Sequence, residues 1–366
     1  MYIFSGINYS LAFEWMARYT DTVKYDVHYV FLYTDVPLLA KVLNKNNLQT
    51  HFIKYRGKKD LPKTTIKLIN LLRKIKPEIV HTHLFDANVA GLTAAKLSGI
   101  KKRIYTRHHS TYHHTYHPHA VRYDRYCNML ATHIVAITNT VADVLINMEH
   151  VSPQKISVVH HGFDISSFEN PNESVIGSLK EKYNPHQQRP VIGVISRFTE
   201  WKGVQYIIPA FKKLLNNFPD ALLMLANATG DYQHEIVKLL KQIPARNYVT
   251  IDFEKDIIAL YRLFDIFVHV PIDEHSEAFG QVYIEALAAG LPSVFTLSGI
   301  ANDFIENNVN AAVVTYKNED EILNAFMRIL NDASFAQRIA RKGKTDVEKL
   351  FGIERMIKEL EQVYEH

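Results

Sequence analysis

Short apolar runs rich in Val and Ile alternate along this chain with longer amphipathic stretches. Strands buried on both faces are continuously apolar, whereas the helices that cover them repeat apolar residues every three or four positions. This alternation is typical of βα units around a parallel sheet, and it constrains the fold more than any other feature. In the first half we expect strands at 27–33, 77–83, 103–109, 133–139 and 155–164, and helices at 63–76 and 88–99.

The same pattern begins again after a polar stretch at 169–190. A length of 366 residues also exceeds what one typical core holds. We therefore predict an α/β chain of two doubly wound, Rossmann-like domains that face a central cleft, because ligands bind beyond the carboxyl ends of such strands. The expected domains are 1–168 and 169–345, with a terminal helix at 346–366 that crosses back to the first. In the second domain we expect strands at 191–198, 221–227, 247–253, 266–270 and 292–296.

Charge is distributed unevenly between the two halves. Residues 1–170 carry 21 Lys and Arg against 12 Asp and Glu, whereas the net charge of the whole chain is only +4. The basic half suggests an anionic partner such as a membrane surface or a phosphorylated acceptor. An uneven but merely solvated surface is an equally open alternative. We expect no nucleic-acid partner.

Cellular location is indicated by what the sequence lacks. Cys127 is the single cysteine, so no internal disulfide can form, which fits a reducing compartment. We find neither the run of about 18 apolar residues of a spanning helix nor the pattern of a signal peptide. We therefore expect a cytoplasmic protein with, at most, peripheral contact with an anionic membrane.

The segment 277–292, EAFGQVYIEALAAGLP, is the strongest motif. We expect Ala278, Phe279 and Gly280 to form a loop that leads into a helix beginning near Gln281, with Glu285 one turn inside it. The free N–H groups at a helix start suit an anion or sugar hydroxyls, and a carboxylate such as Glu277 can accept two hydrogen bonds from a vicinal diol. For Glu285 the structural alternative is a carboxylate stabilised by the helix dipole.

A second motif, SRFTEWKG at 196–203, follows an expected strand and precedes an expected helix. Phosphates are usually bound at that position. Arg197 and Lys202 would supply two cations there, and charge that grows on a leaving diphosphate would be stabilised by them. An exposed basic turn is the alternative interpretation.

Together these motifs resemble glycosyltransferase family 4. Residues 277–292 match every fixed position of its motif E-x-FG-x4-E-A-x-A-x-G-x-P, and 197–202 resembles its R-x4-K segment. The resemblance covers most of the chain and implies GT-B architecture, with an acceptor-binding first domain and a nucleotide-sugar-binding second domain. It implies that Glu277 contacts the donor sugar, that Glu285 holds the ribose, and that Arg197 and Lys202 bind the diphosphate without a metal.

In the first domain, Thr106-Arg107-His108 resembles the family's T-x-H strand end, which implies that His108 reaches the donor sugar; His109 competes for that role. The family's double-glycine loop is represented only by Gly6. The segments 79–83, 135–138 and 158–164 resemble other family strands, and we expect them to be scaffold.

The segment 107–126 contains histidines at positions 108, 109, 113, 114, 117 and 119. Metal binding is one interpretation, because His113 and His117 would share a helical face. Pro118 breaks that helix, however, and no cysteine or carboxylate cluster completes a ligand set. We therefore expect no metal, and a loop that faces an acceptor or a membrane.

The implied reaction is transfer, with retention of configuration, from a UDP- or GDP-linked sugar to a saccharide or lipid-linked saccharide. The sugar would be a hexose or an N-acetylhexosamine, and the product a cell-surface polysaccharide, lipopolysaccharide or glycolipid. We expect no cofactor. A nucleotide-sugar epimerase of the same fold and an inactive nucleotide-sugar-binding relative are the alternatives.

Overall fold

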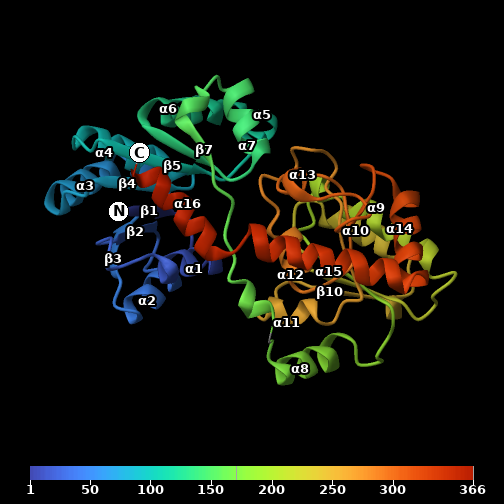
Figure 1. Ribbon diagram of the computed structural model, residues 1–366. Helices are drawn as coiled ribbons and strands as arrows, with labels where there is room; N and C mark the ends of the chain where they lie inside the picture. The colour runs from blue at the N-terminus through green and yellow to red at the C-terminus, as the bar shows by residue number, and fades with distance from the viewer. Residues whose placement is uncertain (170, 366) are drawn as a thin grey trace. The chain divides into compact units, whose positions relative to one another are not determined.

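The structure is a computed structural model that describes residues 1–169 and 171–365, and it forms two compact units. The N-terminal unit comprises Met1–Phe163 together with Phe351–His366, and the C-terminal unit comprises Asp164–Leu350 (Figure 1). The boundaries expected from the sequence, after residues 168 and 345, each differ by five residues from these. The unit boundaries show that the chain returns to the N-terminal unit for its last helix.

The N-terminal unit contains a parallel sheet of seven strands in the order β3-β2-β1-β4-β5-β6-β7. Strand β1 is buried throughout, and β2 and β6 are buried except for one end residue each, which explains why these strands are largely apolar in the sequence. The strands are β1 (Tyr2–Ser5), β2 (His28–Tyr33), β3 (Gln49–Lys54), β4 (Ile79–His83), β5 (Lys102–Arg107), β6 (His133–Ala136) and β7 (Ile156–Val158).

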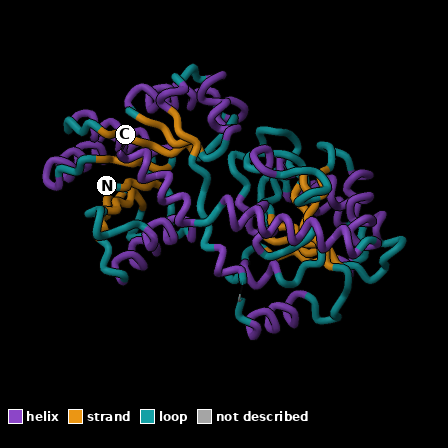
Figure 2. Tube along the Cα trace, in the orientation of Figure 1, coloured by secondary structure: helices purple, strands orange, loops and turns teal. Residues whose placement is uncertain are grey.

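Helices alternate with these strands (Figure 2). In α3 the buried residues Thr64, Leu68 and Leu72 recur every fourth position and form the face that covers the sheet. The helices are α1 (Leu11–Tyr19), α2 (Leu38–Lys45), α3 (Leu61–Ile75), α4 (Phe85–Leu97), α5 (Tyr112–Tyr116), α6 (Val121–Leu130), α7 (Asn139–Asp143) and α16 (Ile353–Glu365), with short helical turns η1 (Lys58–Asp60), η2 (Pro118–Ala120), η3 (Val144–Met148) and η4 (Pro153–Lys155).

The C-terminal unit contains a second parallel sheet, of six strands in the order β10-β9-β8-β11-β12-β13. Its strands are β8 (Val191–Ile195), β9 (Leu222–Ala226), β10 (Tyr248–Ile251), β11 (Ile266–His269), β12 (Ser293–Phe295) and β13 (Ala312–Val313). Its helices are α8 (Glu173–Tyr183), α9 (Val204–Leu214), α10 (Gln233–Leu240), α11 (Ile257–Tyr261), α12 (Gln281–Ala288), α13 (Ala301–Phe304), α14 (Glu319–Asn331) and α15 (Ala333–Leu350), with turns η5 (Ile165–Phe168), η6 (Glu200–Lys202) and η7 (Ala245–Asn247).

The strand order reverses once in each sheet, beside its first strand. The reversal lies between β1 and β4 in the N-terminal unit and between β8 and β11 in the C-terminal unit. These orders are those of doubly wound sheets, so the prediction of two Rossmann-like domains is confirmed. The loops at the carboxyl ends of β8 and β11 therefore lie side by side, and they carry the two strongest motifs.

Two details differ from the sequence prediction. The strand expected at 155–164 spans only Ile156–Val158, because the following chain packs against α16 instead. A Cβ at Gly162 would lie 2.8 Å from the Ile353 Cα, and the Gly162 N–H donates to the Met356 sulfur at 3.0 Å. Strands β1, β3 and β13 were not predicted; β13 spans only two residues.

Candidate functional site

The Glu277 carboxylate lies in the loop that joins β11 to α12, and only 7% of the residue is exposed. Its Oε1 accepts hydrogen bonds from Lys202 Nζ and from His269 Nε2, the latter at 2.9 Å. The Glu277 N–H donates to Ser298 Oγ at 2.9 Å, which fixes the backbone of the loop. The side chain is thus held by groups from two separate segments, and the backbone of the residue by a third.

The charge of Glu277 is set by these partners. Burial alone would raise the pKa of the carboxyl, but the positive charge of Lys202 and the hydrogen bond from His269 outweigh it and lower the pKa to about 2. The carboxylate is therefore ionised at neutral pH and acts only as a hydrogen-bond acceptor.

Lys202 ends η6, the turn that follows β8. Gly203, the next residue, has φ +75°, and a Cβ there would lie 1.8 Å from the Val270 carbonyl oxygen. A side chain at this position would therefore collide with the chain after β11, so glycine allows the two loops to meet. The Ile272 N–H joins them further by donating to the Trp201 carbonyl at 3.1 Å.

Arg197 follows β8 after one intervening residue, Ser196. Its side chain is exposed, and it forms no ion pair with any residue in the described ranges 1–169 and 171–365. The two predicted cations therefore differ: Lys202 is bound to Glu277, whereas Arg197 is available to a ligand.

The helix predicted to begin near Gln281 is α12, and it begins at that residue. Gly280 precedes it with φ +85°, a conformation that favours glycine, and Phe279 is buried beside it. Glu285 lies one turn inside the helix, where its Oε2 accepts from Tyr261 Oη at 2.8 Å. Burial raises the pKa of Glu285, although the Tyr261 hydrogen bond opposes the shift.

His108 lies in the N-terminal unit, immediately after β5. Its Nε2 is 3.1 Å from His83 Nδ1, and its ring stacks on that of His161 with centroids 5.4 Å apart. Burial, together with the neighbouring imidazoles of His161 and His83, holds the pKa of His108 well below its usual range. The ring is therefore neutral at physiological pH. His83 and His161, expected to be scaffold, lie in direct contact with it.

Gly6 follows β1 with φ +67°, and its N–H donates to the Leu32 carbonyl at 3.2 Å. A Cβ there would have no atom within 4 Å. Glycine is favoured at this position by the backbone conformation and not by crowding.

Asp124, from α6, reaches the histidine-rich segment. It contacts His113 and His109, and it forms an ion pair with the buried Arg107. The premise that no carboxylate cluster completes a ligand set overlooked the single carboxylate of Asp124, which groups with His109 and His113. The second premise holds: α5 ends at Tyr116, so His117 does not continue its face.

His269, Ser298 and Tyr261 contact the predicted glutamates but were not predicted from the sequence. Of these, only His269 gives a signal in the sequence, because it is a polar residue at the end of the otherwise apolar strand IFVH. Since its Nε2 bonds to a carboxylate, it must carry the proton there. Its buried Nδ1 has no hydrogen-bond partner in the described part of the chain.

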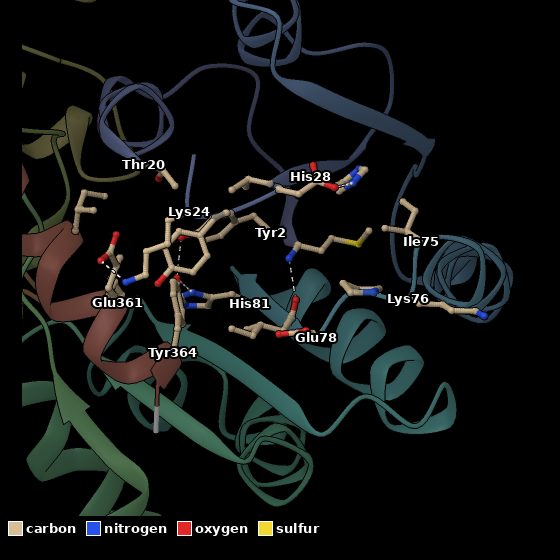
Figure 3. A pocket seen from close by; sticks show the side chains of 18 residues that line it. Tyr2, Thr20, Lys24, His28, Ile75, Lys76, Glu78, His81, Glu361 and Tyr364 are labelled. Carbon is tan, nitrogen blue, oxygen red and sulfur yellow. Dashed lines mark hydrogen bonds and ion pairs between the residues drawn. The ribbon is translucent and has the colours of Figure 1, made fainter. Parts of the chain in front are cut away.

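A cavity of about 370 Å³ lies at the amino ends of the strands of the N-terminal sheet, beside the first residues of β1, β2 and β4 (Figure 3). Tyr364 of α16 lines it and bonds to Tyr2 Oη and His81 Nδ1, both at 2.7 Å. None of the predicted site residues lines this cavity. The two hydrogen bonds of Tyr364 attach α16 to the sheet.

No helix in the described ranges has both the length and the apolar character needed to cross a membrane.

Two protein families match the chain in sequence. Residues 16–167 match Glycosyltransferase Family 4, and residues 176–346 match Glycosyl transferases group 1. The two matches therefore account for most of the N-terminal unit and most of the C-terminal unit.

Individual relatives extend over most of the chain. The capsular polysaccharide biosynthesis glycosyltransferase CapM of Staphylococcus aureus is 26% identical over 92% of this chain and 96% of its own length. A UDP-Gal:α-D-GlcNAc-diphosphoundecaprenol α-1,3-galactosyltransferase of Escherichia coli is 25% identical over 74% of this chain and 70% of its own. The crystal structure of Anabaena HepE with UDP-glucose has a TM-score of 0.83 at 17% identity, with 100% of this chain and 99% of that chain covered, which shows a shared fold.

Proposed function

Because this chain belongs to glycosyltransferase family 4, we propose that it transfers a sugar from a nucleotide-sugar donor to a hydroxyl acceptor with retention of anomeric configuration. The observation that carries the proposal is the contact of Lys202 with Glu277, where the loops after β8 and β11 meet. A cation beside a hydrogen-bond acceptor suits a glycosyl diphosphate, whose phosphates require positive charge and whose sugar hydroxyls require acceptors.

The diphosphate is assigned to Arg197, Lys202 and the N–H groups at the start of α12. Negative charge grows on the diphosphate as the glycosidic bond breaks, so cations that contact it stabilise the transition state more than the ground state. Two cations and a helix N-terminus can supply this charge without a metal ion at the donor site.

The sugar is assigned to Glu277 and the loop Ala278–Gly280, and the ribose to Glu285. Glu277 is ionised and acts as an acceptor, and His269 continues to hold it when Lys202 turns to the diphosphate. Glu285 is fixed by Tyr261, which leaves carboxylate acceptor capacity for a diol.

His108 is assigned to positioning the sugar and not to acid–base catalysis, because its imidazole is neutral and already bonded to His83. The acceptor hydroxyl would then attack from the face that the diphosphate leaves, and a phosphate oxygen of the donor would take its proton. Gly6 would let the backbone after β1 approach the bound substrates.

We further assign a UDP-linked hexose as donor and a lipid-linked saccharide as acceptor. The support is that HepE was crystallised with UDP-glucose and that the Escherichia coli relative is named for UDP-Gal and a diphosphoundecaprenol acceptor. The name of CapM supports a product in cell-surface polysaccharide.

Contact with an anionic membrane is assigned to α5 and α6. These helices expose Tyr112, Tyr116 and Tyr123 beside Arg122 and Arg125, a mixture of aromatic and basic groups that suits a lipid interface. R122E/R125E should release the protein from vesicles that contain phosphatidylglycerol. The control K241E/R246E makes the same charge change in the C-terminal unit and should leave binding intact. Equal binding by wild type and R122E/R125E refutes this assignment.

Donor binding is tested by thermal stabilisation in EDTA with UDP-glucose, UDP-galactose, UDP-N-acetylglucosamine and GDP-mannose. A ligand at 100 times its Kd stabilises the folded state by about 2.7 kcal/mol, which is readily measured. R197M/K202M should abolish the stabilisation, whereas K241M, which removes an exposed lysine of the same unit, should not.

Transfer is tested with the donor that binds and a lipid-linked saccharide, and the anomeric configuration of the product is read by NMR. E277Q should lose transfer while it still binds UDP. Transfer by E277Q at the wild-type rate would overturn the role of Glu277, and inversion of configuration would overturn retention. A free epimer formed from donor alone would identify an epimerase.

A further inference from the structure

Three metal-ligating groups converge in the N-terminal unit. His109 lies in the loop after β5, His113 in α5 and Asp124 in α6. His113 Nδ1 lies 2.7 Å from Asp124 Oδ2, and His109 Nε2 lies 3.5 Å from the same oxygen. One donor atom from each residue lies within 4.8 Å of the other two.

We propose that His109, His113 and Asp124 bind a divalent transition-metal ion, with zinc as the preferred ion. Zinc is bound by imidazole nitrogen and carboxylate oxygen at about 2.0–2.2 Å, so ligand atoms in a tetrahedral site stand about 3.4 Å apart. The separation of His109 from Asp124, 3.5 Å, is near this value, and that of His113 from Asp124, 2.7 Å, is shorter. Adjustments of the two imidazole rings would bring all three atoms to it.

Burial distinguishes this cluster from histidines that meet by chance on a surface. The side chains of Asp124 and His113 are 4% and 11% exposed, whereas that of His109 is 21% exposed. Two ligands are therefore fixed inside the fold, and an ion can enter past the third. A three-ligand set leaves the fourth tetrahedral position for water.

A second layer of contacts orients the ligands. The other oxygen of Asp124, Oδ1, is 3.1 Å from Arg107 Nη1, so the ion pair occupies one oxygen and leaves Oδ2 toward the histidines. Arg107 Nε donates to the His109 carbonyl at 3.1 Å, which holds the backbone of that ligand. Such outer contacts fix ligand geometry in known metal sites.

The local charge also permits a cation. The guanidinium of Arg107 is paired with both Asp124 and Glu149, so these three groups together carry one negative charge. A divalent ion would change that sum to one positive charge and would join the loop after β5 to α5 and α6. The ion would thus cross-link the segment 107–126.

The test is isothermal titration of zinc sulfate into the untagged full-length protein after EDTA and dialysis. We expect one zinc to bind, and we expect H113Q and H109Q each to weaken it by at least about 100-fold, more than the loss of an outer contact does. H119Q is the matched control, because His119 lies in the same segment and is exposed. It should bind zinc as the wild type does.

Cobalt gives a second readout, since four-coordinate cobalt absorbs strongly in the visible region. The wild type should show this band and H113Q should not. The fold of each variant is checked by circular dichroism in EDTA, and H109Q, whose side chain is the most exposed of the three, replaces H113Q should the latter unfold. Equal zinc affinity in wild type, H109Q and H113Q overturns the proposal, and so does an equal loss in H119Q.

Discussion

Replacing Glu277 with Gln should change how the stability of the C-terminal unit depends on pH. The wild-type carboxyl has its pKa lowered from the ordinary 4.5 to about 2, chiefly because Lys202 and His269 outweigh its burial. Stability from a depressed pKa is present above the unfolded value and is lost as the pH falls toward the folded value. The affected window therefore runs from about pH 5 down to about pH 2.

The magnitude follows from the size of the shift. One pKa unit corresponds to about 1.4 kcal/mol, so the fall from 4.5 to about 2 corresponds to about 3 kcal/mol at neutral pH. Because Glu277 is only 7% exposed, solvent screening removes little of this. Between pH 6 and pH 3 the free energy of unfolding of wild type should fall by about 2 kcal/mol more than that of E277Q.

Urea unfolding followed by tryptophan fluorescence measures this difference. The chain has two tryptophans, and W15F leaves Trp201, which adjoins Lys202, as the reporter of the C-terminal unit. E181Q is the control, because Glu181 is an exposed carboxyl of the same unit. It should follow the wild type at every pH. Parallel curves for wild type and E277Q would show that Lys202 and His269 do not hold this carboxylate ionised.

Two further predictions concern a close backbone contact and a buried ion pair. G203A should destabilise the C-terminal unit more than G290A in urea unfolding. Both glycines have φ +75°, which costs about 1–2 kcal/mol for alanine, but of the two only Gly203 would bring a Cβ against a backbone oxygen, at 1.8 Å. Equal losses would show that the loops can separate without cost. E149A should lower the free energy of unfolding of the N-terminal unit by about 3–5 kcal/mol, because it removes one ion-pair partner of Arg107, which is 1% exposed. Trp15 fluorescence in urea measures this loss. A loss below 1 kcal/mol would contradict this.

The fold could be predicted because its main signal is local. A strand buried on both faces is largely apolar, so β8, β9 and, apart from its last residue His269, β11 stand out in the sequence. β3 does not, because it lies at the sheet edge and exposes Gln49, Phe52 and Lys54. The strand expected at 155–164 was too long because the residues that follow Val158 pack against α16. Sequence alone does not show which partner buries an apolar residue.

The candidate site was partly predictable for a related reason. Glu277, Glu285, Arg197 and Lys202 lie in motifs of fixed local spacing, whereas contacts between segments are invisible in a linear pattern. Lys202 and Glu277 are 75 residues apart. The proposed metal ligands show the same limit. Helical spacing paired His113 with His117, whereas in the structure His113 contacts Asp124 of α6 and groups with His109.

The pairing of Lys202 with Glu277 also bears on how the donor site is prepared. A buried carboxylate without a partner would take up a proton, and a protonated carboxyl is a poorer acceptor for sugar hydroxyls. The lysine keeps the carboxylate ionised before any donor arrives, and the carboxylate keeps the lysine near the end of β8. The His269 bond lies on the same oxygen, Oε1, so the carboxylate would remain fixed if the lysine turned toward a phosphate as proposed. In the proposed transfer neither charge would have to be brought in from solvent, so little reorganisation would be left for the moment of bond breaking.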